Sequence, residues 1–300
     1  MTKAGRALMG LTAALGIVLR LWTYRAPELP PERESTPAEK SGMYFEPAPE
    51  PEVLTARGLG FRNKTDYAPD LEELINRRID FAPGDKVLII HSHTTEAYAM
   101  GDYEPTDPYR TLDREKNVIR VGEEAAEVLR QMGIEVIHDE TLYDYPSYSK
   151  SYENAAAGIK KALAADGKIK AVLDLHRDAL EDQNGNALKT SGTAFGQQCA
   201  GVAIICGSDA SGLSHPGWQN NLGFGLRLQR AMADRFPGLE RDLVLSRYRY
   251  NTHLTELSVI VEVGSHGNTL EEAIVAVRAF ARCYGEVLTG TTRFSQPENR

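Results

Sequence analysis

Three short apolar runs, each leading into a histidine or a glutamate, constrain the fold of this chain more than any other feature. Apolar runs of this length, bounded by polar or turn-forming residues, are typical of buried strands. Polar residues directly after such runs would lie at the carboxyl ends of the strands. The runs are Val87–Ile90 before His91 and His93, Ala171–Leu175 before His176, and Leu257–Val261 before Glu262.

Amphipathic helical segments separate these and other strand-like runs along the chain. Alternation of short apolar strands with helices predicts an α/β fold with a mostly parallel sheet flanked by helices. Ligand sites in such folds lie at the carboxyl ends of the strands. We expect strands at 87–90, 135–138, 171–175, 202–205 and 258–263, and helices at 71–78, 118–132, 154–165, 220–236 and 269–288.

The loop after the first run has the residue types of a zinc site. His93 and Glu96 have H-x-x-E spacing, so one turn can bring an imidazole and a carboxylate to the same ion, and His176 would be the third ligand. A catalytic zinc site usually has three protein ligands and keeps one position for water, whose pKa falls to about 7. His91 remains an alternative to His93, and Glu115 an alternative to Glu96.

Glu262 and Arg177 are the candidate catalytic residues. A carboxylate is needed to take a proton from water and pass it to the leaving amine. Glu262 lies in an apolar run, where a charged group is costly unless it is paired or near a metal. Arg177 could stabilise an oxyanion or hold a substrate carboxylate, or form an ion pair with Asp174 or Asp178. Asp174 shares a strand face with His176.

The N-terminal part of the chain predicts two further segments. Lys3 and Arg6 precede an apolar stretch at 7–19, which predicts a membrane anchor or export signal within residues 1–25 and leaves its cleavage open. Residues 26–56 are rich in proline and glutamate, which predicts an extended tether. The catalytic domain is therefore expected at 57–300, outside the cytoplasm and attached to the membrane.

Charge and cysteine content narrow the classes of function. A net charge of −8 argues against nucleic acid as the main partner, because phosphate binding needs a basic surface. The three cysteines, Cys199, Cys206 and Cys283, contain no C-x-x-C pair, which makes a cysteine-rich zinc site improbable. A bridge between Cys199 and Cys206 is an alternative to our main prediction, small buried thiols.

The chain resembles the stage II sporulation protein P family of endospore-forming bacteria. The resemblance extends over about residues 83 to 290 and rests on several motifs in the same order. These are His91-Ser-His-Thr-Thr-Glu-Ala-Tyr98, Tyr109-Arg-Thr111, Asn117-Val-Ile-Arg-Val-Gly122, His138-Asp-Glu-Thr141, Asp144-Tyr-Pro-Ser-Tyr148, Asp174-Leu-His-Arg-Asp-Ala179, Val261-Glu-Val-Gly-Ser265 and Gly267-Asn-Thr-Leu-Glu-Glu272.

This resemblance implies a cell-wall hydrolase with an amidase fold, similar to zinc carboxypeptidases. It implies Zn²⁺-dependent N-acetylmuramoyl-L-alanine amidase activity on peptidoglycan, with cross-link endopeptidase activity in addition. The ligands would be His93, Glu96 and His176, and Glu262 the catalytic acid/base. Implied partners are stage II sporulation proteins D and M, at the membrane that engulfs the forespore. On chemistry alone, a zinc carboxypeptidase that trims cell-wall peptides is the alternative function.

Overall fold

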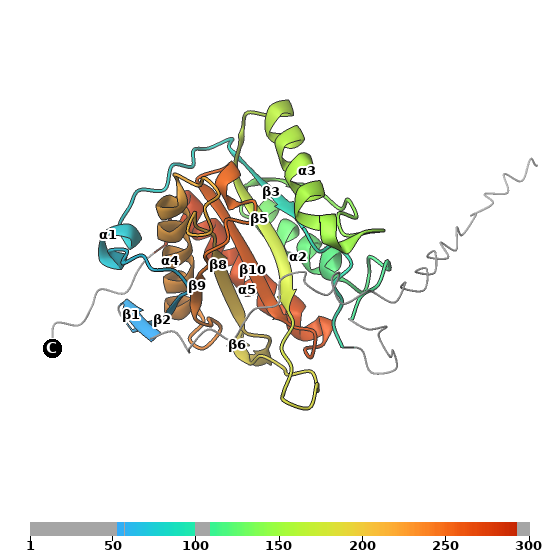
Figure 1. Cartoon of the computed structure of the whole chain (residues 1–300). Coiled ribbons are helices and arrows are strands. Elements are labelled where there is room, and N and C mark those ends of the chain that lie inside the picture. The colour runs from blue at the N-terminus through green and yellow to red at the C-terminus, as the bar shows by residue number, and fades with distance from the viewer. Residues whose placement is uncertain (1–52, 57, 100–108, 293–300) are drawn as a thin grey trace, which may run out of the picture.

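The computed structural model describes residues 53–56, 58–99 and 109–292 (Figure 1). The predicted anchor at 1–25 and most of the predicted tether lie outside the described residues. The sheet already begins at Val53, within the last four residues of the segment predicted as tether. Among the described residues, no helix combines the length and the apolar character needed to cross a membrane.

One eight-stranded sheet forms the centre of the described structure, with strand order β1-β2-β9-β8-β10-β5-β3-β4. The pairs β1–β2 and β8–β10 are antiparallel, and the other pairs are parallel. The strands are β1 (Val53–Ala56), β2 (Leu59–Asn63), β3 (Lys86–Ile90), β4 (Glu135–His138), β5 (Ile169–Asp178), β8 (Val202–Cys206), β9 (Leu243–Leu245) and β10 (Leu257–Ser265); β6 (Gly192–Ala194) and β7 (Gln197–Cys199) form a separate hairpin.

Helices cover both faces of the sheet, as Figure 1 shows. On one face α2, α5 and α4 pack side by side, and α1 packs on α4. On the other face α3 covers the strands β3 and β5. The helices are α1 (Leu71–Ile75), α2 (Val118–Gln131), α3 (Ser151–Ala165), α4 (Trp218–Arg235) and α5 (Leu270–Thr289).

Local sequence signals explain where two of the longer helices begin. The side chain of Asn117 accepts a hydrogen bond from the Ile119 N–H and caps α2. Thr269 and Glu272 form a reciprocal capping box at the start of α5. Gly290, in a left-handed conformation with φ 68°, ends α5.

Strand alternation divides the apolar core into two layers. In β3, Val87 and Ile89 belong to the large cluster under α2, α4 and α5, whereas Leu88 and Ile90 belong to the smaller cluster under α3. These residues are fully buried. A central strand of a three-layer fold is thus apolar on both faces, which is why it reads as a continuous apolar run in the sequence.

The predicted fold class is confirmed: a mostly parallel sheet flanked by helices. The ten predicted elements are present, with ends that differ by a few residues. The strand that contains His176 runs from Ile169 to Asp178 and is longer than expected, since its polar residues remain paired within the sheet. Strands β1, β2, β6, β7 and β9 were not predicted; three of them have only three residues each.

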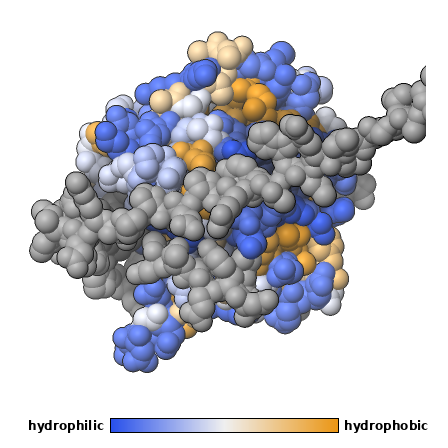
Figure 2. All heavy atoms as spheres, turned by 90° about the vertical axis from the view of Figure 1, so that its right-hand side faces the viewer, coloured by the Kyte–Doolittle hydropathy of each residue, from blue (hydrophilic) through white to orange (hydrophobic). Residues whose placement is uncertain are grey.

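Hydrophilic side chains dominate the visible described surface in Figure 2, where apolar residues form small, separate patches. Such scattered apolar residues are normal for a protein surface in contact with water. The three cysteines are free and buried, which confirms the prediction of small buried thiols and excludes the bridge between Cys199 and Cys206.

Candidate active site

Three neighbouring parallel strands bring the predicted site residues to one edge of the sheet. The strands β10, β5 and β3 lie side by side in that order. Glu262 of β10 lies directly opposite His176 of β5 in the register. His93 follows three residues after the end of β3. The carboxyl ends of parallel strands meet at the same edge, so residues far apart in sequence become neighbours.

His176 lies between two buried carboxylates. Its Nε2 is 2.9 Å from Oδ1 of Asp174, and its Nδ1 is 3.3 Å from Oε2 of Glu96. Burial opposes a charge on His176, but Asp174 and Glu96 outweigh it and raise the pKa of the imidazole well above its usual value. Burial also opposes ionisation of Glu96, yet Arg177 and His176 hold its pKa well below the usual range.

The hydrogen bonds of Asp174 fix the orientation of the His176 ring. Asp174 accepts hydrogen bonds from the backbone N–H of Ser92 at 2.8 Å and from its hydroxyl. Burial opposes ionisation of Asp174, but His176 and Ser92 lower its pKa. A carboxylate accepts, so Nε2 of His176 donates to Asp174, and Nδ1 on the other side of the ring faces Glu96. This carboxylate–histidine pair is the arrangement that orients histidines toward metals.

His93 lies beside His176 with an unused nitrogen. The two rings are 5.3 Å apart, edge to face. Nδ1 of His93 is buried and makes no hydrogen bond. Burial lowers the pKa of His93 to about 3, although Glu96 acts in the opposite direction, so the imidazole is neutral and has a lone pair available for a ligand.

Glu262 presents a second buried atom without a partner, its Oε2. Burial, with the negative charge of Asp178 adding to it, raises the pKa of Glu262 to about 8. A carboxyl group with a raised pKa can hold a proton near neutral pH and release it again. The residue therefore has the properties of a general acid/base at the edge of the His176 cluster.

The donor atoms suit a zinc ion. Neutral imidazole nitrogen and carboxylate oxygen are the ligands that zinc accepts in catalytic sites. Two atoms of this cluster, Nδ1 of His93 and Oε2 of Glu262, are buried without a partner, which is costly unless a further group satisfies them. His93, Glu96 and His176 would hold the ion.

His93, Glu96 and His176 are neighbours, but their candidate ligand atoms do not all lie within 4.8 Å of one another. Among the described residues, the group of three ligand atoms that all lie within 4.8 Å of one another is Glu123, His138 and Glu140, at a different place in the fold.

The two alternative ligands that the sequence left open, His91 and Glu115, have other partners in the structure. His91 is fully buried, and its two nitrogens face the Leu175 carbonyl oxygen at 2.8 Å and the His138 Nε2 at 2.9 Å. Glu115 has a side chain that is 80% exposed and pairs with Arg120. Neither residue joins the cluster of His93 and His176 in the contacts of the described chain.

Arg177, a predicted catalytic residue, contacts Glu96 and two backbone carbonyl groups. Its guanidinium lies 3.6 Å from Oε1 of Glu96 and donates to the carbonyl oxygens of Ala97 and Tyr109. Its backbone N–H also donates to Glu96. The predicted ion-pair partner Asp178 binds Arg241 instead. Arg177 is 4% exposed, so these contacts describe a residue that positions Glu96 and the loop behind it.

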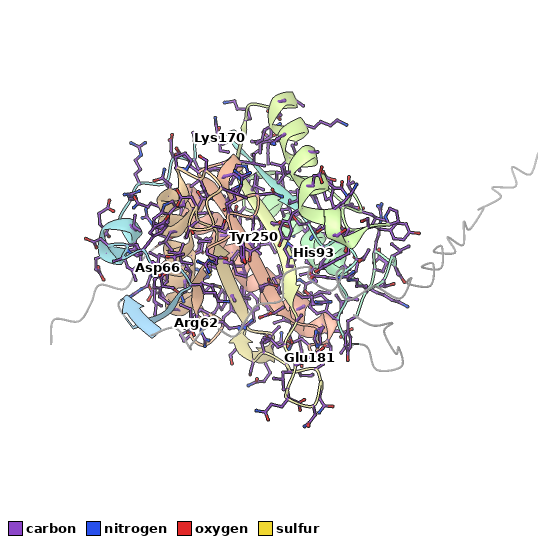
Figure 3. The ribbon with its side chains drawn as sticks, in the orientation of Figure 1. Arg62, Asp66, His93, Lys170, Glu181 and Tyr250 are labelled. Atoms are coloured by element: carbon purple, nitrogen blue, oxygen red, sulfur yellow. The ribbon has the colours of Figure 1, made fainter. Side chains whose placement is uncertain are left out.

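Aromatic side chains around His93 and His176 were not predicted as site residues. Tyr148 stacks on His93 at 4.3 Å, with the Arg110 guanidinium 3.6 Å above its ring. Tyr152 contacts His93, His176 and Tyr250. His93 and Tyr250, which both contact Tyr152, are labelled in Figure 3. The Tyr-x-x-Tyr spacing of the motif at 145–148 and its downstream tyrosine were the available signals, but spacing alone does not show which ring faces the site.

A buried aspartate fixes the loop that carries His93 and Glu96. Asp144 accepts hydrogen bonds from the backbone N–H of Thr95 at 3.2 Å and from its hydroxyl at 2.6 Å. The hydroxyl of Thr94 donates to the carbonyl oxygen of His91 at 2.6 Å. These bonds explain why two threonines stand between the histidine and the glutamate of this loop.

A family comparison covers most of the described chain. The model of the family "Stage II sporulation protein P (SpoIIP)" matches residues 56–284. The chain belongs to the stage II sporulation protein P family. It is 29% identical over 218 residues to stage II sporulation protein P of Bacillus subtilis (strain 168), a match that covers 68% of this chain and 52% of that protein. The chain thus spans about half the length of this curated relative.

Solved structures with a related backbone arrangement are amidases. The CwlD amidase from Clostridioides difficile, in complex with the GerS lipoprotein, has 15% identity and a TM-score of 0.43, covering 69% of this chain and 100% of that chain. The N-acetylmuramyl-L-alanine amidase Ami1 from Mycobacterium abscessus has 13% identity and a TM-score of 0.41, covering 70% and 99%. At these TM-scores, the likeness assigns neither site nor substrate.

Proposed function

We propose that this member of the stage II sporulation protein P family is a zinc-dependent N-acetylmuramoyl-L-alanine amidase that cleaves peptidoglycan during sporulation. The observation that carries the proposal is the cluster at the carboxyl ends of β3, β5 and β10. There Nδ1 of His176 lies 3.3 Å from Oε2 of Glu96, the ring of His93 is 5.3 Å from that of His176, and Glu262 lies opposite His176.

In this proposal His93, Glu96 and His176 hold the ion, and Asp174 keeps His176 in the required orientation through Nε2. A bound zinc ion would polarise the scissile amide carbonyl and acidify a water molecule. Glu262 accepts the proton of the attacking water and returns a proton to the leaving amine nitrogen, which suits a carboxyl group whose pKa is raised to about 8. Arg177 positions Glu96 rather than the substrate.

The aromatic residues supply a surface for the substrate. Tyr148 is 45% exposed and stacks on His93, so a chain that reaches His93 must pass this ring. Tyr152 and Tyr250 line the same part of the site. Sugar rings and short peptides both pack well on tyrosine faces, whose hydroxyl groups can bind polar substituents. These residues would guide the lactyl–peptide junction of peptidoglycan toward Glu262.

The further parts of the proposal concern the setting of the enzyme. We propose cross-link endopeptidase activity in addition, and attachment to the membrane that engulfs the forespore through residues 1–25. Stage II sporulation proteins D and M would be its partners. The family membership and the order of the predicted anchor, tether and catalytic domain support these parts.

The test is incubation of the purified full chain with peptidoglycan sacculi and zinc, followed by mass spectrometry of the soluble products. Amidase activity releases intact stem peptides with a free N-terminal alanine. The variant Glu262→Gln keeps the size of the side chain and is expected to release no peptide. Products trimmed from the C-terminal end would favour a zinc carboxypeptidase, and equal peptide release by wild type and Glu262→Gln would contradict the proposal.

A further inference from the structure

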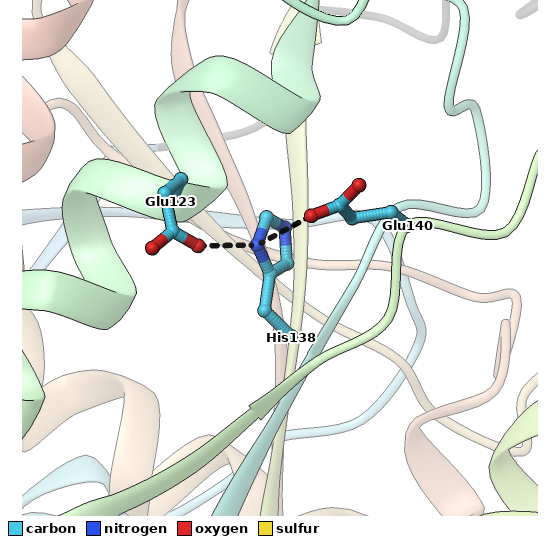
Figure 4. Close-up of side chains that lie close together, drawn as sticks. All are labelled: Glu123, His138 and Glu140. Carbon is cyan, nitrogen blue, oxygen red and sulfur yellow. Dashed lines mark hydrogen bonds and ion pairs between the residues drawn. The ribbon is translucent and has the colours of Figure 1, made fainter. Parts of the chain in front are cut away.

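A second histidine lies between two carboxylates, outside the candidate active site. His138 ends β4, Glu123 lies on α2, and Glu140 follows β4 (Figure 4). Nδ1 of His138 is 3.1 Å from Oε2 of Glu123 and 4.0 Å from Oε1 of Glu140. Among the described residues, these three form the group whose ligand atoms all lie within 4.8 Å of one another.

A hydrogen-bond chain that starts outside this group orients the ring of His138. The carbonyl oxygen of Leu175 can only accept, so Nδ1 of His91 carries the hydrogen of their 2.8 Å bond. His91 is fully buried, and its Nε2 lies 2.9 Å from Nε2 of His138. Because Nε2 of His138 is engaged by His91, the other ring nitrogen, Nδ1, faces the two carboxylates.

Two carboxylates beside one imidazole nitrogen are stabilised by a positive charge between them, which a proton or a metal ion can supply. The ring of His138 is 2% exposed, so water has little access to Nδ1. The same arrangement occurs at His176, whose Nε2 is committed to Asp174 and whose Nδ1 faces Glu96. In both places a buried histidine is oriented from behind, as histidines that bind metals are.

The helix α2 is shaped to let the two histidines meet. A Cβ atom at Gly122 would lie 2.5 Å from Nε2 of His91 and 2.6 Å from Nε2 of His138. Such distances are far below van der Waals contact, so any side chain at this position would displace the pair. Gly122 closes one of the family motifs quoted above, and the active-site chemistry gives it no role.

Each carboxylate retains one oxygen for the shared space. Arg130 binds Oε1 of Glu123 at 2.8 Å, and Arg114 binds Oε2 of Glu140 at 2.6 Å. The oxygens that remain are the two that face His138. The two arginines thus orient the carboxylates without occupying the oxygens that face His138.

Solvent reaches the group of Glu123, His138 and Glu140 through its two glutamate side chains. The side chains of Glu123 and Glu140 are 46% and 40% exposed. Two adjoining surface hollows share Glu140 in their lining; one includes Glu123 and Glu127, and the other includes His138. An ion and its water ligands can therefore enter without movement of the backbone.

We propose that Glu123, His138 and Glu140 form a second divalent-metal site, selective for an ion of the zinc type. One imidazole nitrogen and two carboxylate oxygens suit zinc, whereas magnesium and calcium prefer oxygen ligands throughout. The ion ties α2 to the edge strand β4. Through His138 and His91 it also supports the start of the loop that carries His93. The site does not depend on the proposed amidase activity.

The test is the zinc content of the purified full chain, equilibrated with zinc at a fixed low-micromolar free concentration and measured by mass spectrometry of the metal. We expect Glu140→Gln to lose one equivalent of zinc relative to wild type, because the amide keeps the contact with Arg114 but is a poor ligand. Glu127→Gln, on the same hollow but outside the group, should keep the wild-type content. The variant Glu123→Gln should behave as Glu140→Gln.

The variant His93→Gln separates the two sites. It should lose one equivalent while leaving the equivalent that Glu140→Gln removes, and the double variant should lose both. If Glu140→Gln and Glu123→Gln both retain the wild-type content, the inference is wrong and His138 is an imidazolium ion paired with Glu123. If His93→Gln retains the full content while Glu140→Gln does not, the proposed active-site metal fails and the second site stands.

Discussion

Glu262 lies opposite His176 on the neighbouring parallel strand, and its Oε2 is buried without a hydrogen-bond partner. A buried acid placed beside a histidine flanked by two carboxylates is expensive for folding. The arrangement is consistent with a residue kept for chemistry rather than for stability.

Replacement of Glu262 by glutamine should separate catalysis from metal binding. The amide has nearly the same shape but cannot accept and return a proton, so we expect a loss of roughly 10²–10⁴-fold in kcat. Zinc content should stay at the wild-type level because His93, Glu96 and His176 are intact. Peptide-release rates and metal analysis on the same sample measure both quantities, and a joint loss of metal and activity would assign Glu262 to the ligands.

Replacement of Asp174 by asparagine should weaken zinc binding without removing a ligand. Asp174 accepts from Nε2 of His176 at 2.9 Å, and an asparagine that turned its amide group toward the ring would favour the wrong tautomer. We expect a loss of roughly 10–100-fold in metal affinity, measured by competition with a chelating dye. Asp182→Asn, in an exposed turn, is the control. Unchanged affinity in Asp174→Asn would mean that His176 is oriented by other contacts.

Replacement of Arg177 by methionine should mainly destabilise the fold. The change removes the guanidinium from the buried carboxylate of Glu96, and it also removes donors to the carbonyl oxygens of Ala97 and Tyr109. We expect a loss of about 3–5 kcal/mol in the free energy of unfolding of metal-free protein, measured by urea denaturation. The control Arg278→Met breaks the more exposed pair with Glu124 and should cost less than about 1 kcal/mol.

A substrate-binding role for Arg177 would give a different result. In that case Arg177→Met would keep the wild-type unfolding midpoint, and the defect would appear in KM for peptidoglycan fragments. Equal stability of Arg177→Met and wild type would therefore contradict the positioning role assigned here.

His215 should make the fold sensitive to acid. Burial, with the nearby His253 adding to it, lowers the pKa of His215 to about 4, against 6.5 in the unfolded chain. The folded pKa is depressed, so between pH 6.5 and 4 the unfolded chain binds more protons. Stability is full above 6.5 and falls as the pH drops through about 4. Discounting for partial solvent access, the effect is on the order of 1–2 kcal/mol.

The variant His215→Gln tests this pH dependence. Its amide can still donate to the hydroxyl of Thr252, as Nε2 of His215 does at 3.1 Å. We expect the difference in unfolding free energy between neutral and acidic buffer to be smaller in the variant than in wild type. Urea denaturation at both pH values measures it, and an identical acid-induced loss in both proteins would exclude His215 as the cause.

The order of strands and helices could be predicted because each element carries its own burial pattern. The apolar runs at 87–90 and 171–175 are buried on both faces, and such runs are recognisable without knowledge of their neighbours. Short strands such as β9 (Leu243–Leu245) were missed because three residues are too few to show a periodic pattern of burial. The strand with which β9 pairs in parallel, β2, also lies far away in the sequence.

The role of Arg177 could not be predicted, since its position after a strand fits an oxyanion donor as well as a buried ion pair. Its partner Glu96 comes from a loop 81 residues earlier. The same holds for His138, which showed no signal in the sequence because its partners lie on α2 and at the end of β3.

By itself, the sequence determined the α/β architecture, the strand ends at which chemistry is concentrated, and the family. These depend on local periodicity and on motifs read along the chain. Only the tertiary structure decided which nitrogen of each histidine is free, which carboxylate is compensated by an arginine and which is not. Those properties follow from contacts between segments that are remote in sequence, and from the loss of water that their packing brings about.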